Sequence, residues 1–355
     1  KRIKSHIPYR VLDAPNLKND FYTNLVAWSS KTGKVGVGLG NNVYLWNEES
    51  GAIPLQTIDY EQVITALSFS DSIFLAVGLK NGRILLYDQN QEVVQSNYLN
   101  VDKGICCISW LFGTKKFFVG DEVGDVLLFE VVESNNSHSL YDLKLLKSFK
   151  CHQQQVCGIA ISNDLKQVAI GGNDNCCTIW DVSDLENPKL KFSLPHQAAV
   201  KAISFCPWSN SLLATGGGSK DRRIRFWHTN SGTLLDVINT KGQITSLIWS
   251  KTKKQIVATF GFGDSEKPVL VAVYNYPKMQ SLVQIQATPN LRILSAVPSP
   301  DNSSICVAAN DETVRFYELW SGNPGIVPEA QECGVFGSDL IELCEGIDKG
   351  GDMIR

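Results

Sequence analysis

Residues 200–228 read VKAISFCPWSNSLLATGGGSKDRRIRFWH, and this stretch contains one unit of a pattern that runs through the chain. Its first segment, VKAISFC, has the apolar composition of a buried strand. A second apolar segment, SLLATGGG, runs into glycine, and a third, RIRFW, ends on an aromatic residue. Short runs of β-branched and aromatic residues between turn-forming residues predict three consecutive strands.

The same unit occurs seven times. Its first segments read NLVAWS, ITALSFS, ICCISWL, VCGIAIS, VKAISFC, ITSLIWS and RILSAVPS. The aromatic residues that close the third segments are Trp46, Tyr87, Phe129, Trp180, Trp227, Tyr274 and Tyr317, at spacings of 41 to 51 residues. A period of about 40–45 residues with four strands per unit is typical of WD-repeat propellers. The sequence therefore predicts an all-β fold, a seven-bladed WD-repeat β-propeller.

The two ends of the repeat array predict how the ring closes. The seventh unit stops near Leu319, where SGNPGIVP interrupts the pattern before a fourth strand. Upstream of the first unit, RVLDA can form a strand. We expect this N-terminal strand to complete the seventh blade, because closing the ring removes exposed sheet edges. The predicted organisation is a linker over residues 1–10, the propeller over 11–320 and a flexible C-terminal extension over 321–355.

Composition and motifs argue against several classes of function. The 355 residues are 43% hydrophobic with a net charge of -3, so no basic excess indicates nucleic acid as a partner. No apolar run reaches the roughly 18 residues of a membrane span. The ten cysteines include no CxxC and the histidines are dispersed, so we expect no metal, no cofactor and no enzymatic activity. His152 and His196 each begin a blade, where we expect them to support packing through hydrogen bonds.

Some strings are more specific than the repeat, because they lie in turns that the repeat does not dictate. They are RVLDAPNLKNDFYTNLVAWSS, IGGNDN, AAVKAISFCPW, LLATGGGSKDRRIRFW and DETVRFYELW. Over about residues 7–320 they resemble the Fizzy and Fizzy-related activators of the anaphase-promoting complex, and a fungal meiosis-specific branch is the expected one. The resemblance implies a non-catalytic propeller that presents degradation motifs of substrates, such as cyclins and securin, to a ubiquitin ligase. It also implies pseudosubstrate inhibitors as ligands and a location in nucleus and cytoplasm.

The chain ends in GGDMIR, with Ile354 and Arg355 at the carboxyl end. Members of the resembled family end in Ile-Arg, which docks into a helical-repeat subunit of the ligase. An aliphatic side chain, a guanidinium and a carboxylate form a compact recognition element, and the glycines before them give it reach. Any chain must end somewhere, so the tail has this meaning only together with the propeller strings. The alternative is a generic WD-repeat scaffold for another assembly, which needs neither GGNDN nor the tail.

The resemblance also implies a receptor for the KEN motif, a Lys-Glu-Asn degradation signal. GGNDN supplies Asn173 and Asn175, whose amides can donate to and accept from polar side chains. Gln243 and Arg292 match a glutamine and an arginine of the family, and Ser219 stands where a threonine is common. Arg292 would pair with the glutamate of the motif. On its own, GGNDN indicates a plain tight turn, because Gly and Asn dominate turns, and the binding role depends on Gln243 and Arg292 at matching positions.

A second receptor, for the destruction box, is implied in the groove between the first and last blades. There, acidic residues hold the arginine of the motif and an apolar pocket holds its leucine. Glu312 of DETVRFY matches one acidic position. Family members typically read DW where this chain reads LVAW, so Ala27 replaces the other acid. We therefore expect weaker binding of ordinary destruction boxes, and a gain of about 1 kcal/mol on Ala27→Asp.

Overall fold

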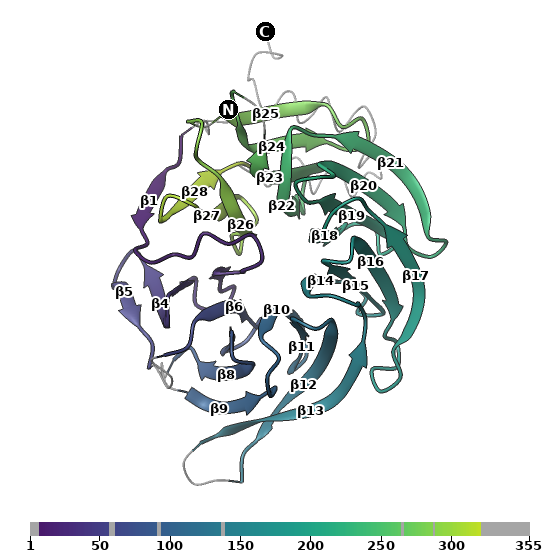
Figure 1. The fold of residues 1–355 in the computed structure, drawn as a ribbon. Helices are drawn as coiled ribbons and strands as arrows, with labels where there is room; N and C mark the ends of the chain where they lie inside the picture. The colour runs from purple at the N-terminus through teal and green to yellow at the C-terminus, as the bar shows by residue number, and fades with distance from the viewer. Residues whose placement is uncertain are drawn as a thin grey trace.

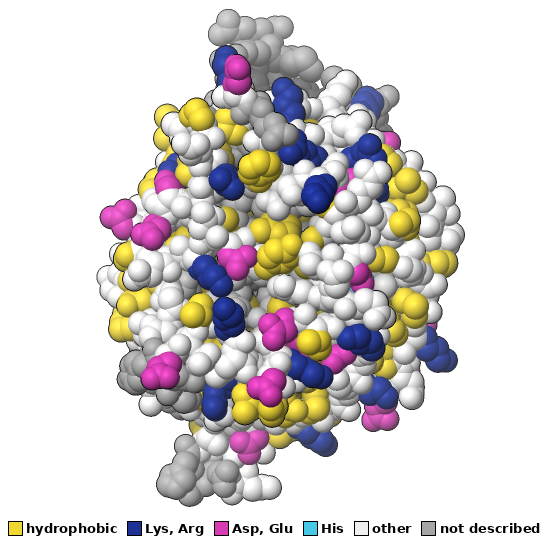
Figure 2. All heavy atoms as spheres, in the orientation of Figure 1, with side chains coloured by type: hydrophobic (Ala, Val, Ile, Leu, Met, Phe, Trp, Pro, Cys, Tyr) yellow, Lys and Arg dark blue, Asp and Glu magenta, His cyan; other side chains and the backbone are white. Residues whose placement is uncertain are grey.

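The computed structural model describes residues 7–56, 61–90, 94–135, 139–263, 266–286 and 288–320, whose strands form a ring around a central opening (Figure 1). In these ranges the strands form seven four-stranded sheets, each with antiparallel neighbours. Each sheet is one blade, with its first strand innermost, so the predicted seven-bladed propeller is confirmed. Figure 2 shows acidic and basic side chains interspersed over the visible face.

The blades are numbered in chain order. Blade 1 contains β2 (Val26–Trp28), β3 (Val35–Leu39), β4 (Asn42–Asn47) and β5 (Gly51–Pro54). Blade 2 contains β6 (Ile64–Phe69), β7 (Phe74–Leu79), β8 (Arg83–Asp88) and β9 (Val94–Leu99). Blade 3 contains β10 (Ile105–Leu111), β11 (Lys116–Asp121), β12 (Asp125–Glu133) and β13 (Tyr141–Lys150). Blade 4 contains β14 (Val156–Ile161), β15 (Gln167–Gly172), β16 (Cys176–Asp181) and β17 (Lys189–Pro195).

The remaining blades follow the same order. Blade 5 contains β18 (Val200–Phe205), β19 (Leu212–Gly217), β20 (Arg223–His228) and β21 (Thr233–Asn239). Blade 6 contains β22 (Gly242–Trp249), β23 (Gln255–Gly263), β24 (Val269–Asn275) and β25 (Ser281–Gln286). Blade 7 contains β26 (Ile293–Pro298), β27 (Ser304–Ala309), β28 (Thr313–Glu318) and β1 (Arg10–Asp13).

Glycines on second strands let neighbouring blades pack closely. A Cβ on Gly120 of β11 would lie 2.5 Å from Cγ1 of Val156, the first residue of blade 4. In the same way, a Cβ on Gly216 of β19 would lie 2.5 Å from Cγ2 of Ile244 in blade 6. Both distances are below contact range, so the β-branched side chain of the next blade fills the space that the glycine leaves. This packing explains why the apolar second segments of the repeat run into glycine.

The N-terminal strand closes the ring. β1 pairs antiparallel with β28 in a register that joins Arg10 to Phe316 and Asp13 to Thr313. It therefore forms the outermost strand of blade 7, as predicted from the unfinished seventh repeat. The predicted C-terminal extension, 321–355, lies outside the described residues.

The described cysteines are all free, and most are buried within the strands. Burial raises the pKa of the Cys157 and Cys206 thiols to about 12, so they remain protonated and pack as small apolar groups. In the described ranges, no three His, Cys, Asp or Glu side chains form a group that could hold a metal ion. The same part of the chain contains no helix with the length and apolarity needed to span a membrane.

Candidate peptide-binding face

One face of the ring, here called the turn face, collects the five residues predicted for the KEN motif. Because neighbouring strands run antiparallel, the turns between second and third strands share a face with the connections that enter each first strand. Asn173 and Asn175 lie in the β15–β16 turn and Ser219 in the β19–β20 turn. Gln243 is the second residue of β22, and Arg292 immediately precedes β26. The fold therefore places all five on the turn face.

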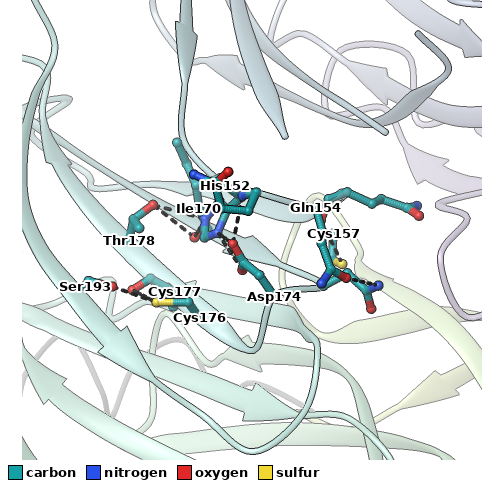
Figure 3. A network of polar contacts seen from close by, with 12 residues as sticks. His152, Gln154, Cys157, Ile170, Asp174, Cys176, Cys177, Thr178 and Ser193 are labelled. Atoms are coloured by element: carbon teal, nitrogen blue, oxygen red, sulfur yellow. Dashed lines mark hydrogen bonds and ion pairs between the residues drawn. The ribbon is translucent and has the colours of Figure 1, made fainter. Parts of the chain in front are cut away.

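A buried histidine holds the GGNDN turn in shape (Figure 3). Nδ1 of His152 lies 2.8 Å from Oδ1 of Asp174, the central residue of the turn. Its Nε2 lies 2.9 Å from the carbonyl oxygen of Ile170 and 3.1 Å from Oγ1 of Thr178. The indole N–H of Trp180 donates to the same hydroxyl at 2.9 Å. The predicted packing role of His152 is thus confirmed, and the turn is anchored to the blade core.

Blade 5 uses a related network to hold the turn GGGSKD. Nε2 of His196 lies 2.7 Å from Oγ1 of Thr215, which also accepts from Nε1 of Trp227 at 2.9 Å. The carboxylate of Asp221 in the turn accepts hydrogen bonds from the two terminal guanidinium nitrogens of Arg225, at 2.6 and 3.0 Å. Burial, reinforced by the positive charge of Arg225, lowers the pKa of His196 to about 4. His196 is therefore neutral at physiological pH, and its predicted role in packing is confirmed.

Asn173 is linked to a residue from the far end of the chain. The hydroxyl of Tyr22 donates to Oδ1 of Asn173 at 2.8 Å, and Nδ2 of Asn173 donates to Oε1 of Gln154 at 3.0 Å. The two partners fix which way the amide points. Asn175 has a φ of 62°, and its carbonyl accepts the backbone N–H of His196 at 2.9 Å. The sequence pattern did not identify Tyr22, because no local signal joins it to blade 4.

An exposed aromatic residue connects the other three predicted positions. Phe262 is 44% exposed, and the guanidinium carbons of Arg292 and Arg222 lie 5.4 and 6.0 Å from its ring centroid. Its backbone N–H donates to Oε1 of Gln243 at 3.3 Å. Nε of Arg222 donates to the carbonyl oxygen of Ser219 at 2.7 Å. Two guanidinium groups on one ring favour a fixed, positively charged site, since cation–π contact restrains both.

The sequence pattern did not identify Phe262 or Arg222 as site residues. Phe262 lies near the end of β23, in IVATFGFG, the glycine-bearing second segment of the sixth repeat. A large aromatic residue between the two glycines at the end of this segment was the signal available, because exposed apolar side chains often mark binding surfaces. Arg222 lies in KDRRIRFW beside other basic residues, and nothing in that string distinguishes it.

A groove of about 770 Å³ lies between blades 1 and 7. Val37, Tyr44 and Trp46 line it from blade 1, and Leu12 and Val314 line it from blade 7. The walls are therefore largely apolar, with the size of a site for peptide side chains. This is the blade boundary at which the resemblance implies a destruction-box receptor.

Glu312 lies beside this groove. It is exposed in the β27–β28 turn with a φ of 58°, and its carbonyl oxygen accepts the N–H of Ala14 at 2.8 Å. Ala14 itself lines the groove. The carboxylate of Glu312 thus extends from the turn that borders the groove on the turn face.

Ala27, the other residue predicted for the destruction-box site, lies away from Glu312. It is 6% exposed in β2, directly opposite Gly36 in the β2–β3 register. A Cβ on Gly36 would lie 3.0 Å from Cδ1 of Leu67 in blade 2, and directly opposite residues of a strand pair share one side of the sheet. The Ala27 side chain therefore points toward blade 2, whereas Trp28 packs on Phe316 of blade 7 at 5.3 Å between ring centroids. The structure does not bring Ala27 next to Glu312.

The two residues predicted to dock the ligase, Ile354 and Arg355, lie outside the described residues. The described surface thus contains the Asn173 amide with two fixed partners, a cation-rich aromatic cluster and an apolar groove. Such groups can bind an extended peptide through hydrogen bonds, a charge pair and buried side chains.

Comparison with known proteins agrees with this architecture. The family profile described as the CDC20/Fizzy WD40 domain matches residues 12–317. The meiosis-specific APC/C activator protein AMA1 of Saccharomyces cerevisiae is 51% identical over 98% of this chain and 64% of its own length. The meiotic fizzy-related protein 2 of Schizosaccharomyces pombe is 33% identical over 96% of this chain and 69% of its own length. The chain thus spans less than two thirds of the first of these relatives.

A solved structure is also similar. A chain in the crystal structure of the mitotic checkpoint complex superposes with a TM-score of 0.80 at 34% identity, covering 90% of this chain and 94% of that chain. The profile match covers nearly all of the propeller and begins within β1, the strand that closes the ring. The resemblance inferred from the turn strings is therefore confirmed, and the chain belongs to the CDC20/Fizzy WD40 family.

Proposed function

We propose that this chain is the substrate-recognition part of a non-catalytic activator of the anaphase-promoting complex, with a role in meiosis. The membership in the CDC20/Fizzy family supports this proposal, as does the similarity to a relative named as a meiosis-specific activator of that complex. The single observation that carries it is the convergence of Asn173, Ser219, Gln243 and Arg292 on the turn face. A generic scaffold would not need Ser219, Gln243 and Arg292 to be linked through Phe262 and Arg222 on the face that also carries Asn173.

In the proposed KEN site, each group has a distinct task. The Asn173 amide, oriented by Tyr22, is available to a polar side chain of the motif. Arg292 stacks on Phe262, which limits its rotamers before the peptide arrives, so less side-chain entropy is lost on binding. Its guanidinium can then pair with the glutamate of the motif in a charge-assisted contact. The second guanidinium, of Arg222, adds positive charge to the same region.

The proposed destruction-box site is the groove between blades 1 and 7. Its apolar walls suit the leucine of the motif, and Glu312 is the carboxylate beside it that suits the arginine. The proposed docking element is the terminal Ile354–Arg355, which would bind a helical-repeat subunit of the ligase. The proposed partners include degron-bearing substrates such as cyclins and securin, and pseudosubstrate inhibitors. We also propose that the protein acts in the nucleus and the cytoplasm.

The proposal is tested by calorimetric titration with a synthetic peptide that contains Lys-Glu-Asn. A peptide with the same residues in scrambled order is the control, because it keeps the composition and charge. We expect saturable binding of the KEN peptide alone. Equal affinity for both peptides, or no binding of either at millimolar concentration, would overturn the KEN proposal and favour the generic scaffold.

A further inference from the structure

The chain between β1 and β2 runs from the rim of the ring into its central opening (Figure 1). Residues 20–24 of this connection, here called the crossing segment, contact several blades. Backbone N–H of Asn24 donates to the carbonyl of Thr65 in blade 2 at 3.0 Å, and its side-chain amide donates to the carbonyl of Cys106 in blade 3 at 3.1 Å. With the bond from Tyr22 to Asn173, the crossing segment reaches blade 4 as well.

A single lysine attaches the crossing segment to the opposite side of the ring. Lys201 belongs to β18, the innermost strand of blade 5, and is 6% exposed. Its ammonium donates to the carbonyl of Thr23 at 3.0 Å and to the carbonyl of Leu294 in blade 7 at 2.7 Å. It also lies 5.2 Å from the ring centroid of Phe21. One side chain thus joins blade 5, blade 7 and the crossing segment.

This ammonium group stabilises a particular geometry at a cost. Its hydrogen-bond partners in the described part of the chain are the two neutral carbonyls of Thr23 and Leu294, so no carboxylate compensates its desolvation at these contacts. Burial lowers the pKa of Lys201 to about 7, although the carboxylate of Asp20 opposes the shift; the thiols of Cys157 and Cys107 near it stay protonated and carry no charge. A buried polar group with few alternative partners restricts the arrangements that the surrounding chain can adopt.

We propose that Lys201 is a positioning residue for substrate recognition, holding the crossing segment across the central opening so that Tyr22 orients Asn173. This inference rests on the proposed function, because the effect of Lys201 on recognition is measured as the affinity for a KEN peptide. Lys201 itself does not contact the peptide in this arrangement. It acts through the carbonyl of Thr23, one residue from Tyr22 in the chain.

The first test is amide hydrogen exchange in residues 20–25, compared between wild type and Lys201→Met. Methionine keeps an unbranched side chain, one heavy atom shorter than lysine, and removes the charge and its N–H donors. Lys251→Met is the matched control, since Lys251 borders the same central channel but is exposed on the face opposite the turn face. We expect faster exchange in Lys201→Met alone. Unchanged exchange would overturn the inference.

The second test is KEN-peptide affinity in a double-mutant cycle of Lys201→Met with Tyr22→Phe. We expect each single variant to bind about fivefold more weakly, as for one lost hydrogen bond. The double variant should bind no more weakly than either single variant, because both changes act through one contact. Faster exchange with unchanged peptide affinity, or fully additive losses, would overturn the positioning role.

The two readouts separate the inference from the proposed function. If wild type binds no KEN peptide, the proposed function fails, while hydrogen exchange still decides whether Lys201 holds the crossing segment. If Lys201→Met does not fold, Lys201→Gln takes its place, because glutamine is polar but uncharged and its amide nitrogen ends one atom short of the ammonium position. Exchange equal to wild type in Lys201→Gln would overturn the inference, and faster exchange would support it.

Discussion

The hydroxyl of Tyr22 donates a 2.8 Å hydrogen bond to Oδ1 of Asn173, a residue 151 positions further along the chain. Tyr22 belongs to the segment that follows the ring-closing strand, and Asn173 belongs to the turn of blade 4. The proposed KEN site is therefore built from the N-terminal connection as well as from the turns of the blades.

Removing the hydroxyl of Tyr22 should weaken KEN-peptide binding. In Tyr22→Phe the Asn173 amide loses one of its two orienting partners, and we expect a loss of about 1 kcal/mol, or roughly fivefold in affinity. Calorimetric titration measures the change. Tyr141→Phe, on the outermost strand of blade 3, is the control and should bind like wild type. Equal affinity of Tyr22→Phe and wild type would exclude an orienting role for the hydroxyl.

Arg292→Ala should weaken KEN-peptide binding by roughly 2 kcal/mol, the size of a lost charge-assisted contact in a partly desolvated site. The loss should largely disappear when the glutamate of the peptide is replaced by glutamine, because that residue is the expected partner. Arg83→Ala, at the β7–β8 turn of blade 2 on the same face, controls for general loss of positive charge. An unchanged dissociation constant would remove Arg292 from the site.

Stability should depend on pH through Lys201. Its pKa is about 7 in the folded protein and near 10.5 when exposed, so between these values the unfolded state binds more protons. The unfolding free energy of wild type should therefore rise with pH relative to Lys201→Met, by roughly 2 kcal/mol from pH 7 to pH 9. Denaturant unfolding of both proteins at each pH measures it. A parallel pH dependence of the two proteins would contradict the low pKa.

Deleting Ile354 and Arg355 should reduce binding to the ligase and leave the propeller folded. The two residues lie beyond the last strand of the ring, so no described blade contact is removed. Co-purification of the ligase with intact and shortened protein measures the loss, and a thermal melt of each checks the fold. Replacing Asp352 and Met353 by alanine controls for changes of tail composition. Equal recovery of the ligase by both proteins would refute the docking role.

The orientation of Ala27 changes the expectation for Ala27→Asp. The sequence alone favours a gain of about 1 kcal/mol in destruction-box affinity. Because the side chain points toward blade 2, we now expect the new carboxylate to couple weakly with the arginine of the motif. A double-mutant cycle with an arginine-to-alanine peptide measures the coupling. Coupling near 1 kcal/mol would show that the carboxylate does reach the groove between blades 1 and 7.

The fold was predictable because its determinants are local and repeated. Each blade shows the same apolar first strand, glycine-bearing second strand and aromatic closer, so one correctly interpreted unit such as residues 200–228 specifies the others. The closing role of β1 followed from counting strands in the last unit. The repeat does not reveal which side of the sheet a given side chain faces. A three-residue strand such as β2 has too few residues for the alternation of side chains between the two sides to be recognised in the sequence.

The site was predictable only where the resembled family supplies a matching residue. Asn173, Asn175 and Ser219 lie in the distinctive turn strings, Gln243 and Arg292 stand at matching family positions, and the fold places all five on one face. Tyr22, Phe262 and Arg222 were missed, because their roles depend on contacts between blades. Lys201 was missed for a similar reason: its sequence, VKAISFC, is that of an ordinary inner strand, and only the ring brings the carbonyls of Thr23 and Leu294 within its reach.

The pairing of β1 with β28 has a consequence for biosynthesis. Arg10 emerges from the ribosome well before its partner Phe316, which is translated about three hundred residues later. During that interval the first blades can form, yet the open ring leaves its terminal edges unpaired, and such edges invite aggregation. The nascent chain should therefore depend on chaperones until blade 7 is complete, and a chain that terminates before β28 should be degraded rather than accumulate as a smaller propeller.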